Sequence, residues 1–128
     1  MSQMSDYLEN ALVNAVLRNQ AFTSPATVYL ALYTSDPTDA KTGTEVSGGG
    51  YVRQAITFNA PTNGATPSAA DVLFPIASAS WGTVTHIGIL DASTVGNLLF
   101  YGALTNSKTI AANDQLKVAA GDITVALA

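Results

Sequence analysis

The stretch that most constrains the fold is a glycine triplet, residues 48–50, which leads directly into a segment of strict alternation, residues 51–58. Side chains on a strand have a period of two, so Tyr51 and Arg53 are expected on one face and their immediate neighbours on the other. Glycines accept positive φ and leave room for another backbone, which favours a sharp entry into a sheet or a close contact with a second chain. The pattern predicts a β domain in which a shaped loop lies beside a regular strand.

The chain from residue 28 onward is also patterned as short strands, separated by turns rich in Pro, Asn, Gly and Ser. Two of these strands, residues 84–91 and 97–104, are joined by a short turn and predict an antiparallel hairpin. The number and spacing of the segments are typical of sandwiches and barrels, and we predict an all-β, antiparallel, jelly-roll-like β-sandwich. About eight strands are expected: residues 28–33, 51–58, 72–74, 84–91, 97–104, 108–110, 115–118 and 123–127.

A hydrophobic core is within reach of a chain of this length, 128 residues, and we expect a single domain, residues 1–128. The chain has no cysteine, so no disulfide framework supports the fold. Alternate apolar positions within the patterned strands are expected to face the core. The predicted core residues are Leu30, Leu32, Ile56, Phe58, Ile87, Ile89, Phe100 and Leu116.

Helical periodicity is convincing in one segment, residues 2–20, where Ser2 or Ser5 can act as the N-cap. A wide apolar stripe on this helix favours packing across the edge or face of the chain's own sheet. Val13 and Leu17 fall on the far side of the helix. The alternative interpretation is therefore that a second apolar patch contacts another subunit.

The composition limits the classes of partner. Charged residues make up only 11% of the chain, against a usual share of about one quarter, and surfaces with few charges are often covered by partners. A net charge of −4 with five scattered Lys and Arg residues argues against nucleic-acid binding. No apolar run approaches the roughly 20 residues of a membrane span. Asp6 and Glu9 occupy the place of a basic signal-peptide region, so we expect a soluble protein that is not secreted by this route.

Candidate reactive residues are few, and none fits a known motif. His86, the only histidine, has no nucleophile or acid in a motif beside it, which favours a half-buried structural role. Asp36, Asp39 and Glu45 could hold Ca²⁺, but their spacing is not that of an EF-hand, which favours loop solvation. Trp81 could stack on a sugar ring, although its apolar neighbours favour a core or interface anchor. We predict no catalytic residue, no cofactor site and no metal site, and hence no enzyme.

Six segments spread over nearly the whole chain carry a family likeness. They are YLENAL at residues 7–12, VYLALYTSDPT at 28–38, GTEVSGGGYVRQ at 43–54, WGTVTHIGI at 81–89, GALT at 102–105 and AGDI at 120–123. Together they resemble a family of small virion structural proteins of tailed bacteriophages, which are commonly labelled tail-fibre or structural proteins. In size and type they are also similar to capsid cement proteins. The resemblance implies a structural role without catalytic residues.

The resemblance and the low charge together predict a non-enzymatic structural protein of a phage particle. A capsid decoration, or cement, protein that stabilises the major capsid lattice is favoured. The alternatives are a tail or tail-fibre component, or a carbohydrate-binding module in which Trp81 or an exposed tyrosine stacks on the sugar. We expect synthesis in the bacterial host cytoplasm and a place on the virion surface. The expected partners are the major capsid protein or other virion proteins and further copies of the chain, with a trimer favoured, and neither nucleic acid nor membrane.

A subunit contact is predicted at the loop of residues 34–50 and the strand that follows it. Glycine backbone groups and an edge strand both offer hydrogen bonds to a neighbour. If this face is covered, Arg53 needs a carboxylate or several carbonyls, because an unpaired buried charge is costly. Its partner could be Glu45 or an acidic residue of a neighbouring subunit, and a solvated arginine beside a flexible loop is the alternative. The residues predicted to make subunit contacts are Val13, Leu17, Gly48, Gly49, Gly50, Tyr51 and Arg53.

Overall fold

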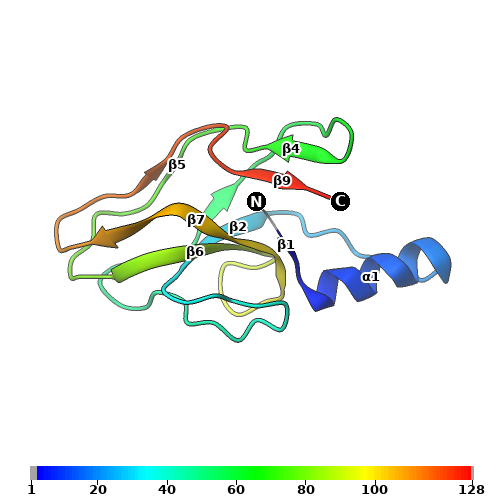
Figure 1. The fold of residues 1–128 in the computed structure, drawn as a ribbon, viewed down its shortest axis with the longest axis horizontal. Coiled ribbons are helices and arrows are strands. Elements are labelled where there is room, and N and C mark those ends of the chain that lie inside the picture. Colours follow the sequence, from blue (N-terminus) through cyan, green and yellow to red (C-terminus); the bar gives the residue numbers. More distant parts are fainter. Residues whose placement is uncertain (1–2, 128) are drawn as a thin grey trace.

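A computed structural model describes residues 3–127 as a sandwich-like assembly of antiparallel strands, with a single short helix in this described part (Figure 1). The prediction of an all-β, antiparallel sandwich is therefore confirmed. In chain order the elements are β1 (Gln3–Met4), α1 (Asp6–Leu17), β2 (Val28–Tyr33), β3 (Gln54–Ile56), β4 (Ala65–Pro67), β5 (Val72–Leu73), β6 (Gly82–Leu90), β7 (Leu98–Ile110), β8 (Lys117–Val118) and β9 (Thr124–Ala126).

The largest sheet has five strands in the order β1-β7-β6-β2-β3. Its centre is the hairpin of β6 and β7, in which Ile89 lies opposite Phe100, as the sequence predicts. β7 continues to Ile110, so the two strands predicted at residues 97–104 and 108–110 are one strand. The pairing shifts between them, and residues 104–107 form a wide bulge opposite β6.

Two short ribbons, β4–β9 and β5–β8, form the covering layer, which Figure 1 shows above the large sheet. Val72 of β5 and Leu116, just before β8, belong to the core that this layer closes. Strand β4 lies inside the predicted loop of residues 59–71 and was missed, because its three residues show no alternation of apolar and polar side chains. β3 is also shorter than the predicted strand of residues 51–58.

The core is divided between the two faces of the large sheet. One face carries the larger cluster, and residues at alternate positions of the same strands carry a smaller one on the other face. Leu30, Leu32, Ile56, Ile89 and Leu116 are buried as predicted. The other three predicted core residues, Phe58, Ile87 and Phe100, are only partly buried. Large buried side chains that the prediction did not name are Tyr33, Phe74, Leu90 and Leu98.

The helix differs most from expectation. It begins at Asp6 after the N-cap Ser5 and ends at Leu17, so the predicted bounds of residues 2–20 are wrong; residue 2 lies outside the described residues. Leu8 is the buried residue of α1, and the main contact of the helix is with β7. Figure 1 shows α1 extending away from both layers. Packing along the sheet is therefore wrong for most of the helix.

A bond network at the start of α1 explains this direction. The Ser5 N–H donates to the Leu99 carbonyl at 2.9 Å, and the Ser5 hydroxyl donates to the Leu98 carbonyl. The helix is thus fixed to β7 at its N-cap and leaves the sheet from there. With 12 residues, α1 is too short to cross a membrane, and residues 3–127 contain no helix that could do so.

Candidate functional site

The glycine triplet packs against the buried Trp81 through Gly49. Gly48, Gly49 and Gly50 all have positive φ, at 75°, 59° and 80°. The Gly49 carbonyl accepts a hydrogen bond of 2.9 Å from Trp81 Nε1, and a Cβ atom at Gly49 would lie 2.9 Å from the Trp81 ring. Only glycine fits this position, because both the backbone angle and the space exclude a side chain. Part of the backbone that was expected to pair with a neighbour is thus bonded within the chain.

Trp81 is an anchor of the core. It is buried and contacts the rings of Tyr51 and Phe74 edge-on, with centroid distances of 5.4 and 6.3 Å. The interpretation of Trp81 as a core anchor is confirmed. Its burial excludes it as a platform on which a sugar could stack.

Glu45, Tyr51 and Arg53 form a compact polar cluster, here called the Glu45 cluster. Arg53 donates from Nε and Nη2 to the two oxygens of Glu45, each at 2.8 Å. The Tyr51 hydroxyl donates to Glu45 Oε2 at 2.6 Å and accepts the Leu32 N–H at 3.0 Å. Tyr51 and Arg53 thus share a face, as the alternation predicts. Of the partners considered for Arg53, Glu45 is the one present, and the interpretation as a solvated arginine is wrong because its side chain is 7% exposed.

The protonation states of the Glu45 cluster follow from its bonds. Burial alone would raise the pKa of Glu45, but the hydrogen bonds from Arg53 and Tyr51 outweigh burial and hold that pKa below its usual range. Burial, together with donation to the Glu45 carboxylate, raises the pKa of Tyr51 well above its ordinary value. The bond to Glu45 also raises the pKa of Arg53. The cluster is therefore a fixed ion pair with a neutral phenol at neutral pH.

The turn between β6 and β7 is tied to the same cluster. Arg53 Nη1 donates to the carbonyls of Ala92 and Val95 at 2.9 and 2.8 Å, and Lys41 Nζ donates to the Gly96 carbonyl at 2.6 Å. Val95 has φ 55°, which is rare for a β-branched residue, and its side chain is 79% exposed. The tied turn thus presents a valine to solvent.

The predicted subunit-contact residues fall into two separate groups. Gly48, Tyr51 and Arg53 line a shallow cavity with Val95, beside the edge strand β3. Val13 and Leu17 lie on α1, whose other end meets the loop of residues 34–50 where the Asp6 N–H donates to the Asp39 carbonyl. The structure therefore brings the glycine and arginine positions together but not the helix positions. A contact between either group and another subunit stays a prediction.

The three loop carboxylates considered for Ca²⁺ do not converge. Glu45 is bound by Arg53, and Asp36 accepts the N–H of Thr38. Asp39 instead lies near Asp6 and Glu9, with one oxygen of each carboxylate within 4.8 Å of the others. All three are exposed, and exposed carboxylates commonly gather without an ion, so this group is not taken as a metal site.

His86 is half-buried, as predicted, on β6. Its Nδ1 lies 2.8 Å from the Thr85 hydroxyl, and its Nε2 lies 4.0 Å from an Asp36 carboxylate oxygen. The Thr85 contact has the length of an ordinary hydrogen bond, whereas the Asp36 contact is loose and involves a carboxylate that is more than half exposed.

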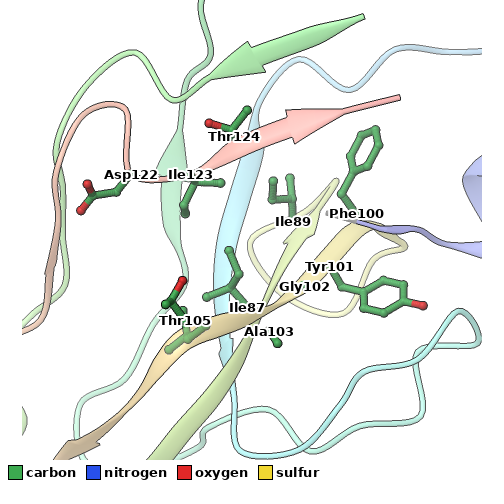
Figure 2. Close-up of a pocket in the computed structure, with 11 residues that line it drawn as sticks. Ile87, Ile89, Phe100, Tyr101, Gly102, Ala103, Thr105, Asp122, Ile123 and Thr124 are labelled. Carbon is green, nitrogen blue, oxygen red and sulfur yellow. The ribbon is translucent and has the colours of Figure 1, made fainter. Parts of the chain in front are cut away.

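A cleft between β7 and the segment before β9 was missed by the sequence analysis. It consists of two adjoining cavities of about 130 and 320 Å³, here together called the β7–β9 cleft. Figure 2 shows Ile87 and Ile89 of the sheet and Ile123 of the covering segment around the first cavity. Residues common to both cavities are Ile87, Leu104, Thr105, Asp122 and Ile123.

The physical cause of the cleft is the bulge in β7. Residues 104–107 leave the regular pairing with β6, because Val84 lies opposite Lys108 while His86 lies opposite Ala103. The covering segment therefore cannot close fully over this part of the sheet. No local sequence signal marks such a bulge, and the partial burial of Ile87 follows from it.

Comparison with known proteins gives one family. The family of the Podophage GP4 fiber I protein gp80 matches residues 3–126 of this chain. No curated protein matches it significantly. The chain belongs to the gp80 family, and the resemblance to virion structural proteins of tailed phages is thereby confirmed.

Proposed function

We propose that this member of the gp80 family is a non-enzymatic structural subunit of a phage fibre. The observation that carries the proposal is the match over residues 3–126 to a family described as a fibre protein. Residues 3–127 fold as a small β domain, and we place this domain at the base, joint or tip of a fibre.

The geometry of the polar residues supports a structural role. The donors of Arg53 are directed to Glu45 and to two turn carbonyls, and the Tyr51 hydroxyl is bonded on both sides. A catalytic group must be able to exchange a proton with a substrate during the reaction. The polar atoms of Arg53 and the Tyr51 hydroxyl are instead hydrogen-bonded to groups of this chain. The Glu45 cluster serves to hold the loop of residues 34–50 against the turn between β6 and β7.

Capsid decoration is the second candidate. Two features favour it: the low content of charged residues and a compact domain with an exposed apolar helix end, both suited to a subunit that covers a lattice of other proteins. A carbohydrate-binding module is less supported, because the buried Trp81 cannot serve as the stacking platform.

The location of the protein in the particle tests the proposal. Intact phage carrying an epitope-tagged copy would be labelled with gold-coupled antibody and imaged by electron microscopy. Label on the fibres is the expected result. Label distributed over the head would contradict the fibre role and favour capsid decoration. Particles that carry neither label nor protein would overturn the structural role itself.

A further inference from the structure

We propose that residues 3–8, here called the N-terminal segment, are exchanged between copies of this chain, so that the segment of one copy pairs with β7 of another. The structure shows the closed form, in which the segment pairs with β7 of its own chain. Exchange keeps these contacts and changes only the chain that supplies them, which makes it a low-cost route to oligomers. The inference goes beyond the proposed function, because it does not depend on whether the subunit belongs to a fibre or to a capsid lattice.

The N-terminal segment has one well-defined docking site, the edge of β7. β1 pairs with β7, and Met4 lies opposite Phe100. The Ser5 N–H donates to the Leu99 carbonyl at 2.9 Å, and both Ser5 and Leu8 are buried. β1 is the edge strand of the large sheet, so without it β7 would present unpaired backbone groups. The same site accepts the same residues from any copy of the chain.

The connection between the N-terminal segment and the rest of the domain is long and weakly held. α1 has 12 residues, which correspond to about 18 Å of helix, and it leads away from both layers (Figure 1). Residues 18–27 then return to β2 (Figure 1). In the part of the chain that the structure describes, residues 21–26 make no hydrogen bond, ion pair or ring contact, and most of them are exposed. Little besides the segment itself therefore keeps α1 on its own domain.

Asn19 reverses the direction of the chain at the end of α1. It has φ 54°, in the left-handed region, and the Gln20 N–H donates to the Asn14 carbonyl at 3.0 Å. This is the Schellman arrangement that commonly ends helices. If Asn19 leaves the left-handed region, the linker turns outward, and residues 18–27 in extended form span up to roughly 35 Å. The N-terminal segment then reaches a neighbouring copy.

The hinge and the concentration of copies set the balance between the two forms, because the contacts of the N-terminal segment are the same in both. The closed form requires the left-handed conformation at Asn19, which any residue with a side chain adopts at some cost. Subunits of a particle are held at a high effective concentration, which offsets the entropy lost on association. Both terms favour exchange in an assembled particle. A closed cycle of three exchanges would give the trimer favoured by the sequence.

Mixed single-cysteine variants of the full chain test the exchange directly, because the chain has no cysteine. Met4→Cys and Phe100→Cys, one of them lengthened by a tag, would be co-expressed, purified together and mildly oxidised. Their thiols lie opposite each other only where the segment of one copy pairs with β7 of another. Denaturing gels should show about tenfold more mixed disulfide dimer than a control mixture, because paired strands hold the thiols at a high effective concentration. The control is Met4→Cys with Thr94→Cys, which moves the second thiol to an exposed turn.

Two substitutions at Asn19 test the hinge without cysteines. Glycine adopts the left-handed conformation freely, whereas a β-branched residue strongly disfavours it. Asn19→Gly should therefore retain the closed monomer, and Asn19→Val should raise the ratio of exchanged to closed chains by about tenfold per hinge. Light scattering after size exclusion, over a series of concentrations, measures this ratio. Circular dichroism should show the same β-sheet content in both variants.

The outcomes separate the possibilities. Mixed dimers that exceed the control, together with oligomers that increase in Asn19→Val, support exchange. Mixed disulfides at the level of the Thr94→Cys control would overturn it, as would Asn19 variants that both stay monomeric at every concentration. A double variant Met4→Cys, Phe100→Cys that links only within its own chain would overturn it as well. Exchange that fails in a protein found on fibres leaves the proposed function standing, and exchange in a protein found on the head removes only the fibre role.

Discussion

At the scale of single residues, Arg53 is the side chain whose removal should lower the free energy of unfolding most. Arg53→Ala leaves Glu45 partly buried without its counter-charge and frees two turn carbonyls. The expected loss in the free energy of unfolding is about 2–4 kcal/mol, since breaking a largely buried pair costs more than the pair contributes. Urea denaturation measures it.

Lys117→Ala is the control for Arg53→Ala. Lys117 pairs with Asp71 at 3.5 Å, but both side chains are more than half exposed, so the loss should stay within about 0.5 kcal/mol. If the two variants unfold at the same urea concentration, the Glu45 cluster does not hold the loop.

Gly49 and Gly48 allow a matched test of the glycine triplet. Gly49→Ala combines positive φ with a clash against Trp81, and it should destabilise the fold by about 2 kcal/mol or more. Gly48→Ala meets no atom within 4 Å and bears only the backbone strain, about 1 kcal/mol. Thermal unfolding of both variants measures the difference. Equal melting temperatures would show that the contact with Trp81 is not tight.

At the scale of elements, Ser5 decides where α1 begins and how it is held. Its side-chain oxygen accepts the Leu8 N–H and its hydroxyl donates to the Leu98 carbonyl, and the residue is buried. Ser5→Ala removes a helix cap and leaves that carbonyl without this bond, at a cost of about 1–2 kcal/mol. Urea denaturation should show this loss, whereas exposed Ser93→Ala should change little. A neutral Ser5→Ala would mean that the helix is not anchored through this residue.

The end of α1, residues 11–17, should open independently of the sheet. Its amides are protected by helix bonds, while β6 and β7 pair with each other over most of their length. Hydrogen exchange followed by mass spectrometry should therefore be fast in residues 11–17 of the monomer and slow in β6. Amides of residues 11–17 protected as strongly as those of β6 in a proven monomer would contradict this prediction.

At the scale of the whole molecule, stability should form a plateau between acid and alkaline limits. The pKa of Glu45 in the folded protein lies below its ordinary value of 4.5, so its contribution is complete above that pH and is lost as the pH falls through the folded value. Burial raises the pKa of Tyr33 from 10.0 to about 12. Its contribution is complete below pH 10 and is lost as the pH rises toward 12. Urea midpoints measured across pH check both limits.

Tyr51 contributes to the alkaline limit in the same direction, because its pKa is also raised. Tyr51→Phe should therefore weaken the fall in stability above pH 10, at the cost of the bonds to Glu45 and Leu32. An unchanged alkaline limb in this variant would show that Tyr51 ionises no later in the folded than in the unfolded chain.

The sequence by itself determined the elements whose signals are local. A short apolar run that ends at a turn predicted β2, and two strand-like segments joined by a short turn predicted the hairpin of β6 and β7. Ser5 was among the predicted caps of α1, and the alternation after residue 50 placed Tyr51 and Arg53 on one face. These features depend on side chains within a few positions of one another, so the residues alone specify them. The family likeness was also visible there, because it is a property of the residue string.

Only the tertiary structure decided which distant groups meet. Three features depend on how segments far apart in the sequence come together. They are the pairing of Arg53 with Glu45, the contact of Gly49 with Trp81 and the bulge beside the β7–β9 cleft. The direction of α1 was decided in the same way: its apolar stripe fitted a sheet-packed helix, but bonds from Ser5 to β7 turn it outward. An amphipathic pattern specifies that a face will be covered, and it does not specify by what, because the hydrophobic effect has no direction.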